Sequence, residues 1–475
     1  MRIEVLEAIP AAGKTKAFLR DVRDNPNGCV VASISRKLSK DSLNYYESIG
    51  GSDMVIIDGD HCSNGSVTQS IKQNIDKRVI FITHKALLEV DLSMFEGRDL
   101  YIDEVPDLVN MENYRFKEHF HVIEKYCDVE MTSENMGSVK LKRGCKSKIS
   151  SMINSGLKED DCISRSIYPI FQSLLQELPV KIKKDDDGIV LFFVRDSTMN
   201  NWDKLNTVTI ACANFEETFT GKILKHWCKW EVARSDLNDV LDFYEYPNSE
   251  RVTIHVLCDK KWSRTVADKK YKSHTVYEEA VRRVQNHIGN ESYLYTTNKS
   301  RGKLTGREIQ YNPHGLNRYM NETNIVALFS YNPMPWQVPI LNKLSEMCDM
   351  PKDTLAKAFT ISKFIEPVFQ LCTRGNIRIA HSKKPINLYV PDLRTAKYLI
   401  ERYIPKGKID TSLMIEVERD KKPKKRKPKS IPALLGMNKK QRANWYYHVR
   451  TKGYGNSIDD PKDIANARKW LNEQK

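Results

Sequence analysis

The residues with the clearest chemical potential stand near the start of the chain, in the stretch EAIPAAGKTK (7–16). Its spacing, A-x-x-x-x-G-K-T, is typical of a loop whose backbone N–H groups surround a phosphate. Lys14 would contact the β- and γ-phosphates and Thr15 would contact Mg²⁺, while Gly13 lets the backbone approach closely. The predicted nucleotide-contacting residues of this loop are Ala11, Ala12, Gly13, Lys14 and Thr15.

Two features of this loop depart from the usual pattern. Ala8 stands where a glycine is common, which is acceptable if the turn there does not need a positive φ. Pro10 removes one backbone donor and must therefore occupy a position that does not need one. The alternative interpretation is a strand, a turn and a helix that contain GKT by chance.

An acidic pair follows an apolar run in LYIDEVPDL (100–108). The carboxylate of Asp103 suits Mg²⁺, held through water or Thr15, and Glu104 could act as general base toward an attacking water. Taken alone, such a pair could equally be a strand end with solvated acids. Because it follows a phosphate loop, we predict a nucleotide-hydrolysing site that uses ATP and Mg²⁺.

A sheet is needed to bring these residues together, and short β-branched runs predict one. In the first half these runs are RIEVLEA (2–8), CVVAS (29–33), VIFIT (79–83), DLYIDE (99–104) and TVTIACA (207–213). In the second half they are RVTIHVL (251–257), SYLYTTN (292–298), NIVALFS (324–330) and PINLYV (385–390). Near-continuous apolar strands alternating with helical segments are typical of parallel sheets covered on both faces. We therefore predict an α/β fold with two domains, 1–235 and 236–415.

Further motifs occur in a fixed order along the chain. They are ISRKLSKD (34–41), ITHKALL (82–88), TIACANFEETF (209–219), YLYTTNKSR (293–301), HGLNRY (314–319) and FQLCTRGNIR (369–378). With the phosphate loop and the acidic pair, this set resembles the superfamily 2 helicases and translocases over roughly residues 1–405. It is most similar to phage and viral members, including viral origin-binding helicases. The resemblance implies two tandem RecA-like domains that hold ATP between them.

The resemblance also implies which residues contact the tracked strand. SRKLS (35–39) is similar to the family's T-R-E-L-A, and THKAL (83–87) is similar to T-H-x-x-L. Hydroxyls and cations at strand ends suit phosphate oxygens. The implied strand-contacting residues are Ser35, Arg36, Thr83, His84, Lys85, Thr297 and Asn298. In ACAN (211–214), Asn214 replaces the threonine of the family motif that links hydrolysis to domain movement.

The late segment QLCTRGNIR (370–378) resembles the family pattern Q-x-x-G-R-x-x-R. Gln370 and Arg374 fit it, Thr373 replaces the glycine, and Arg378 lies one residue later than the pattern. Arginine suits a γ-phosphate because it stays charged and presents a planar fork. Either Arg374 or Arg378 could be the arginine finger that contacts the γ-phosphate. In HGLNRY, the resemblance places Gly315 and Asn317 at the cleft, near nucleotide and strand.

Composition agrees with a polyanion-binding protein. The chain of 475 residues has 76 Lys and Arg against 61 Asp and Glu, a net charge of +15. Its ten cysteines form no CxxC pair, which argues against a zinc ribbon. Because no signal peptide or apolar run of about 18 residues occurs, we expect no membrane partner and a cytoplasmic location, that of the host if the protein is phage-encoded.

Three segments lie outside the two-domain pattern. The separation between Glu104 and Ala211 is longer than is usual between these two motifs. We therefore expect a helical insertion at about 112–185, which is either a wedge or a structural element. Residues 416–431 hold a basic, proline-containing linker. Residues 432–475 predict a small helical module around Trp445 and Trp470, which would bind nucleic acid or dock a protein.

These observations predict an ATP-dependent helicase or translocase. We expect it to act on DNA with a single-stranded portion, as a monomeric motor in phage or mobile-element replication or recombination, with replication proteins as partners. The alternatives are an origin-binding or remodelling ATPase switch and a packaging-type ATPase motor.

Overall fold

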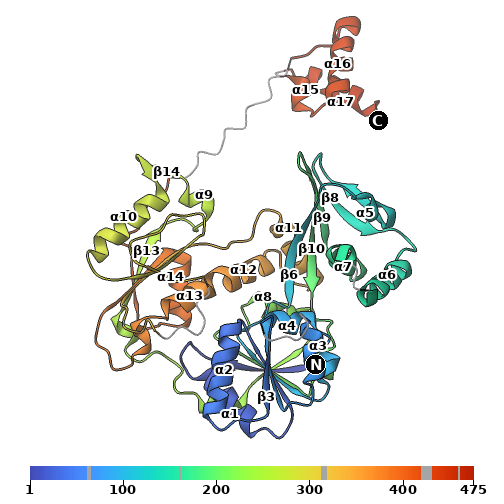
Figure 1. The fold of residues 1–475 in the computed structure, drawn as a ribbon. Helices are drawn as coiled ribbons and strands as arrows, with labels where there is room; N and C mark the ends of the chain where they lie inside the picture. Colours follow the sequence, from blue (N-terminus) through green and yellow to red (C-terminus); the bar gives the residue numbers. More distant parts are fainter. Residues whose placement is uncertain (61–65, 160–161, 312–317, 419–429, 458–459, 475) are drawn as a thin grey trace. The chain divides into compact units, whose positions relative to one another are not determined.

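The computed structural model describes residues 1–475 except 61–65, 160–161, 312–317, 419–429, 458–459 and 475. The chain divides into two compact units, Met1–Val417 and Glu418–Lys475 (Figure 1). Within the described part of the chain, the helices are too short or too polar to cross a membrane.

The first parallel sheet of the larger unit has seven strands in the order β12-β1-β11-β5-β2-β4-β3. The strands are β1 (Arg2–Glu7), β2 (Cys29–Ser33), β3 (Met54–Ile57), β4 (Val79–Thr83), β5 (Asp99–Asp103), β11 (Thr207–Cys212) and β12 (Glu231–Arg234). The helices that connect them include α1 (Lys14–Asp24), α2 (Arg36–Ser48), α3 (Val67–Gln73), α4 (His84–Glu89) and α8 (Phe219–His226). Val30 and Val31 are both buried, in separate hydrophobic clusters. The continuous apolar runs therefore reflect a sheet covered on both faces.

The second parallel sheet has six strands in the order β17-β16-β18-β19-β13-β20. They are β13 (Val252–Cys258), β16 (Leu294–Thr297), β17 (Arg307–Glu308), β18 (Asn324–Leu328), β19 (Ile386–Asp392) and β20 (Lys408–Asp410). Its helices include α10 (Val276–Ile288), α13 (Glu366–Cys372) and α14 (Leu393–Arg402). The predicted α/β fold with two RecA-like parallel-sheet domains is thus confirmed.

The insertion differs from the expected helical segment at about 112–185. It contains a five-stranded antiparallel sheet in the order β6-β10-β9-β8-β7. Its elements are β6 (Val109–Phe116), α5 (His121–Tyr126), β7 (Cys127–Met131), β8 (Met136–Leu141), α6 (Lys146–Glu159), α7 (Cys162–Leu175), β9 (Val180–Asp185) and β10 (Gly188–Asp196). Along β6, Val109, Met111 and Phe116 are buried among more exposed residues. Such alternation favours a half-buried strand over a helix.

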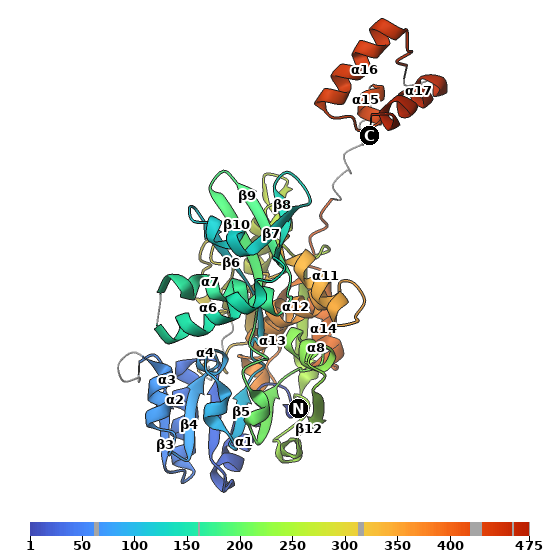
Figure 2. The same cartoon turned by 90° about the vertical axis from the view of Figure 1, so that its right-hand side faces the viewer.

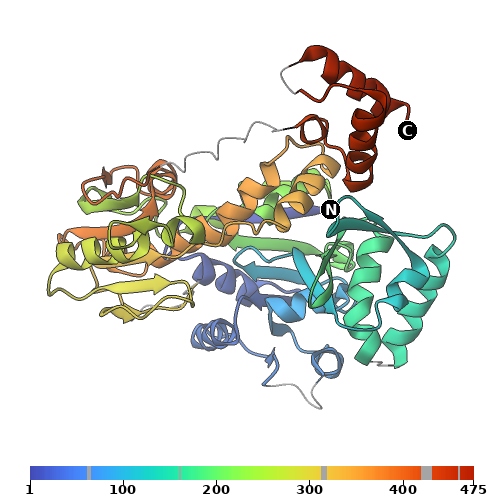
Figure 3. The same ribbon diagram turned by 90° about the horizontal axis from the view of Figure 1, so that it is seen from above.

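The insertion shares a hydrophobic cluster with helices of the second domain, α11 (Gln337–Met347) and α12 (Thr354–Thr360). Figure 3 shows these orange helices beside the teal and green insertion strands. The ring of Phe192 on β10 stacks on Trp336, with centroids 4.5 Å apart. The insertion is therefore packed against both motor domains.

The smaller unit contains α15 (Ile431–Leu434), α16 (Lys439–Lys452) and α17 (Pro461–Asn472), shown in Figure 2. Trp445 and Trp470 are at the centre of its own cluster. The Trp445 Nε1–H donates to Asn456 Oδ1 at 3.0 Å. Asn438 and Gln441 form a capping box that fixes the start of α16. This unit thus has a core of its own.

Candidate nucleotide site

The register of the first sheet places the predicted chemical residues along one edge. Asp103, the last residue of β5, lies opposite Ser33 on β2 and Ala211 on β11. Ser33 in turn lies opposite Thr83 on β4. In parallel sheets ligands bind beyond the carboxyl ends of the strands, which is where the phosphate loop also begins, after Glu7.

The predicted phosphate loop connects β1 to α1. Ala11 and Gly13 have φ of 71° and 91°, and α1 begins at the next residue, Lys14. The Lys14 side chain is 7% exposed, and its Nζ donates to the carbonyls of Ala8 and Ile9 at 2.6 and 3.2 Å. The first residue of the motif therefore serves through its carbonyl oxygen. An alanine can provide that group as well as a glycine.

The Thr15 hydroxyl donates to Asp103 Oδ2 at 3.2 Å, which brings together the two predicted Mg²⁺ residues. Among the described residues, no three His, Cys, Asp or Glu side chains gather as a metal cluster. Mg²⁺ typically binds one or two protein oxygens together with water and substrate phosphates. The Thr15 hydroxyl after the loop and the Asp103 carboxylate at the end of β5 are a suitable pair for that ion.

Glu104 is held in an uncommon backbone conformation, with φ of 72°. Its N–H donates to the Ala211 carbonyl at 2.7 Å, and its Oε1 accepts from Gln370 Nε2 at 3.4 Å. Non-glycine residues with positive φ store strain and are frequent at functional sites. The structure thus directs the predicted general base toward the second domain.

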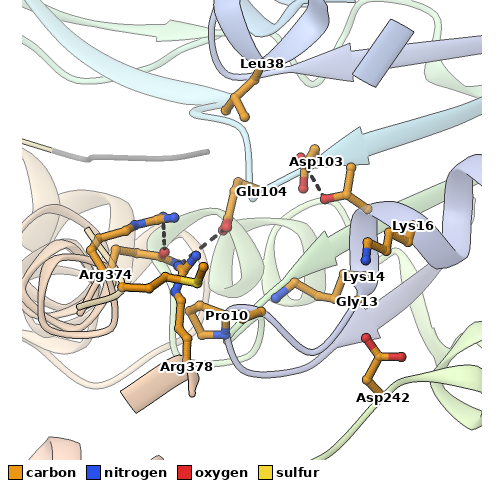
Figure 4. A pocket seen from close by; sticks show the side chains of 14 residues that line it. Pro10, Gly13, Lys14, Lys16, Leu38, Asp103, Glu104, Asp242, Arg374 and Arg378 are labelled. Carbon is orange, nitrogen blue, oxygen red and sulfur yellow. Dashed lines mark hydrogen bonds between the residues drawn. The ribbon is translucent and has the colours of Figure 1, made fainter. Parts of the chain in front are cut away.

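Arg374 and Arg378 reach the same cleft from the second domain (Figure 4). Arg374 is 4% exposed; its Nη2 donates to Gln370 Oε1 at 3.0 Å, and its Nε has no hydrogen-bond partner among the described residues. Burial, together with the nearby charge of Arg378, lowers the pKa of Arg374 to about 9. Burial also lowers the pKa of Arg378. A buried and a half-buried cation beside one cleft form a site suited to an anion.

The cleft has a volume of about 370 Å³ and is lined from both domains. The predicted residues that it brings together are Ala11, Gly13, Lys14, Thr15, Asp103, Glu104, Gln370, Arg374 and Arg378. Ala12 is fully buried in the loop. Thr373, which replaces the family's glycine, is also fully buried, and its hydroxyl donates to the Phe369 carbonyl at 3.0 Å. Gly315 and Asn317 lie outside the described residues.

The segment that connects the two domains packs on the phosphate loop, which the sequence did not predict. The Asp242 N–H donates to the Ala12 carbonyl at 3.0 Å, and the Tyr246 hydroxyl donates to the Pro10 carbonyl at 3.0 Å. A Cβ added to Gly13 would lie 2.9 Å from Asp242 Oδ2. Because the exposed Asp242 side chain could turn away, it is the φ of 91° that favours a glycine at position 13.

A second set of contacts between the domains surrounds the buried carboxyl group of Glu366, at the start of α13. Its Oε1 accepts from the hydroxyls of Tyr398 and Tyr403 at 2.8 and 2.6 Å. Asn214, at the end of the first sheet, donates to the Tyr398 hydroxyl at 2.5 Å. Burial raises the pKa of Glu366 to about 7. The helix that carries Gln370 is thereby connected to the ACAN segment.

The predicted strand-contacting residues of the first domain lie at its carboxyl edge, but several have structural partners. The Ser35 and Thr83 hydroxyl oxygens cap α2 and α4, each accepting a backbone N–H at 3.3 Å. Arg36 pairs with Asp60. Lys85 is exposed, whereas His84 is buried. Each capping hydroxyl keeps a hydrogen that a phosphate oxygen can accept.

In the second domain, Thr297 ends β16 and Asn298 follows it. The Asn298 side chain donates to the Ser330 carbonyl at 3.2 Å and accepts from the Ser330 N–H at 3.1 Å. Both polar groups of Asn298 therefore hold a neighbouring loop.

No protein-family model matches the chain, and no curated protein matches its sequence. Among solved structures, the chain is similar to Xpd4 of S. tokodaii, with 11% identity, a TM-score of 0.44 and coverage of 86% of this chain and 96% of that one. It is also similar to a hypothetical ATP-dependent RNA helicase from Sulfolobus tokodaii (12% identity, TM-score 0.24, covering 84% and 89%). A further match is a DEAD box protein from Methanococcus jannaschii (10% identity, TM-score 0.27, covering 88% and 89%).

Proposed function

We propose that the protein is an ATP-dependent nucleic-acid helicase or translocase of the superfamily 2 type. The observation that carries this proposal is the composition of the cleft. The phosphate loop and the acidic pair come from one parallel-sheet domain, and Arg374 and Arg378 come from the other. A site divided in this way can hydrolyse ATP efficiently only when the two domains are together.

Each group in the cleft has a role in phosphoryl transfer to water. Lys14 and the loop N–H groups would hold the β- and γ-phosphates, and Thr15 and Asp103 would hold Mg²⁺, which neutralises charge on the phosphates. Glu104 would accept a proton from the attacking water. The Arg374 guanidinium would neutralise charge that develops on the transferred phosphoryl group.

The same division supports coupling to movement. Ser35, Arg36, Thr83 and Lys85 lie at the carboxyl edge of the first domain, and Thr297 lies at a strand end in the second. If the domains close on ATP and separate after hydrolysis, two strand-contacting surfaces change their distance along one polymer. Such alternation would move the protein along a single strand.

DNA with a single-stranded portion is the polymer that we propose, in a phage or mobile-element replication or recombination role. The replication or recombination role rests on the resemblance of the motifs to phage and viral helicases, and the net charge of +15 favours a polyanion of either kind. The origin-binding or remodelling switch is the second candidate. The separate core of residues 431–474 favours it, because an independent module can recognise a site while the ATPase changes conformation.

ATP hydrolysis by the purified protein tests the proposal, measured alone and with single-stranded DNA, duplex DNA or single-stranded RNA. We expect strong stimulation by single-stranded DNA, with loss of hydrolysis in Lys14→Ala. A Lys16→Ala variant is the matched control, because Lys16 lines the same cleft one residue beyond Thr15. Hydrolysis that is indifferent to every polymer would contradict a translocase and favour the switch.

A further inference from the structure

The positive charge of the protein is concentrated at its C-terminal end. Residues 418–475 contain seventeen Lys and Arg and six Asp and Glu, so this segment carries +11 of the net charge of +15. The preceding 417 residues, which contain the whole ATP cleft, are close to neutral at +4. Long-range attraction to a polyanion therefore belongs mainly to the smaller unit.

Within that unit, α16 has a distinctive surface. It contains five Lys and Arg and no Asp or Glu. Trp445 anchors one side of the helix in the core, fully buried. The other side presents two tyrosines, Tyr446 and Tyr447, which are 38% and 63% exposed.

Helical geometry groups these exposed side chains. At 3.6 residues per turn, Lys439, Tyr446 and Arg450 share one stripe, and Lys440 and Tyr447 lie seven residues apart on the adjacent stripe. All five residues are exposed. The result is one continuous face in which aromatic rings lie between cations, defined below as the α16 face.

This combination favours a nucleic acid as the partner. Lysine and arginine neutralise backbone phosphates, and a tyrosine ring can stack on a base. The capping box and the tryptophan core hold α16 in place within its own unit, so the face is already formed. A preformed face loses little conformational freedom when it binds.

We propose that the α16 face binds nucleic acid, through phosphate contacts from Lys439, Lys440 and Arg450 and base contacts from Tyr446 and Tyr447. Its residues differ from those that line the ATP cleft and from the predicted strand-contacting residues. It extends the proposed function, because it gives the protein a nucleic-acid contact that needs no ATP.

Binding of fluorescein-labelled oligonucleotides to the full-length protein tests this site, by anisotropy without ATP. The double variant Lys440→Ala/Arg450→Ala removes two charges from the α16 face. The control Lys462→Ala/Lys469→Ala removes two charges from exposed positions on α17. Tyr447→Ser removes a ring and leaves the charge unchanged. Unaltered thermal unfolding and unstimulated ATP hydrolysis would show that each variant is folded.

We expect the α16 pair to weaken binding about tenfold or more and to reduce the slope of log K against log salt by about 2 for duplex DNA. Tyr447→Ser should weaken binding about fivefold or more, mainly to single strands, with little change in slope. The α17 pair should change affinity by less than about threefold. A preference for single-stranded over duplex DNA would identify base stacking as the main contact, and the reverse preference would identify the phosphates.

Equal weakening by the α16 and α17 pairs would overturn the proposal, because general charge attraction would then explain binding. Unchanged binding in all variants would also overturn it, as would competition by polyglutamate at the same charge concentration as DNA. The measurement is independent of hydrolysis. A Lys14→Ala protein should show the same dependence on the α16 face even if the ATPase proposal fails.

Discussion

Arg374 and Arg378 lie on the same side of the cleft, but their surroundings differ. The Arg378 Nε–H donates to the Thr373 carbonyl of its own segment, which occupies part of its fork. Arg374 contacts Gln370, the same side chain that contacts Glu104, and its Nε has no partner among the described residues. Arg374 therefore has more donor capacity for an arriving phosphate.

We predict that Arg374→Ala lowers the polymer-stimulated kcat by about 10³-fold or more, as an arginine finger does. Arg378→Ala should lower it less. Arg374→Lys keeps the charge but lacks the planar fork, so it should recover only a small part of the rate. Steady-state hydrolysis at saturating ATP measures all three. A larger loss in Arg378→Ala than in Arg374→Ala would assign the finger to Arg378.

Glu104→Gln tests the general base with almost no change in shape. Glutamine cannot accept the proton of the attacking water, so kcat should fall by about 10²- to 10⁴-fold. ATP binding should remain, because the phosphate loop and Asp103 are unchanged. Equilibrium binding of a fluorescent ATP analogue separates the two effects. If affinity for the analogue fell together with kcat, Glu104 would have a role in binding instead.

The residues that belong to motifs of fixed spacing could be predicted from the sequence. Lys14, Thr15 and Asp103 belong to this class: the Thr15 hydroxyl contacts the Asp103 carboxylate, and their binding of a phosphate and Mg²⁺ stays a prediction. Asp242 and Tyr246 could not be predicted from the sequence. Asp242 contacts the loop through its backbone N–H, and Tyr246 contacts it through its hydroxyl. Many residue types at many positions could provide such contacts, so no spacing indicates them.

At the scale of elements, the buried strands were the predictable part. A strand covered on both faces has a continuous apolar run, as in β2 and β5. The antiparallel sheet of the insertion was missed because its pairing joins distant segments, such as β6 with β10. The alternation within β6 and the apolar run of β10 indicated strands, but the patterns around α5 and α7 favoured a helical interpretation.

Helix α13 connects the cleft to the Glu366 contacts, and this connection predicts a dependence on pH. The pKa of Glu366 rises from 4.5 to about 7, mainly because the carboxyl group is buried. The folded protein therefore binds this proton more tightly than the unfolded chain. Its contribution to stability is fully present below about pH 4.5 and decreases as pH rises to about 7, by on the order of 3 kcal/mol.

Glu366→Gln should remove this dependence, because glutamine accepts the tyrosine hydroxyls but does not ionise. Relative to the variant, the wild-type protein should lose stability as pH rises from about 4.5 to about 7. Thermal unfolding of both proteins across that range measures the difference. Tyr398→Phe removes one hydrogen-bond donor to the Glu366 carboxylate. It should therefore raise the pKa of Glu366 and move the loss of stability to higher pH. Parallel profiles for wild type and Glu366→Gln would show that Glu366 stays in one protonation state.

At the scale of the whole molecule, charge and catalysis are divided between the two compact units. The unit of residues 1–417 contains both parallel sheets and every described residue of the cleft, with a net charge of only +4. The unit of residues 418–475 carries the remaining +11. Under the proposed function, the smaller unit would attract the polymer and the larger unit would hydrolyse ATP.

Truncation after Val417 should separate these two properties. Hydrolysis without polymer should be unchanged, because the truncated chain keeps the hydrophobic clusters of both motor domains. Half-maximal stimulation should need about tenfold or more DNA at low salt, since most of the positive charge is gone. The difference between the two proteins should shrink as salt is raised, because screening weakens the contribution of the basic segment in the intact chain. A titration of DNA at several salt concentrations measures this. Equal DNA requirements at low salt would mean that the nearly neutral motor captures its track through contacts at the strand edges alone.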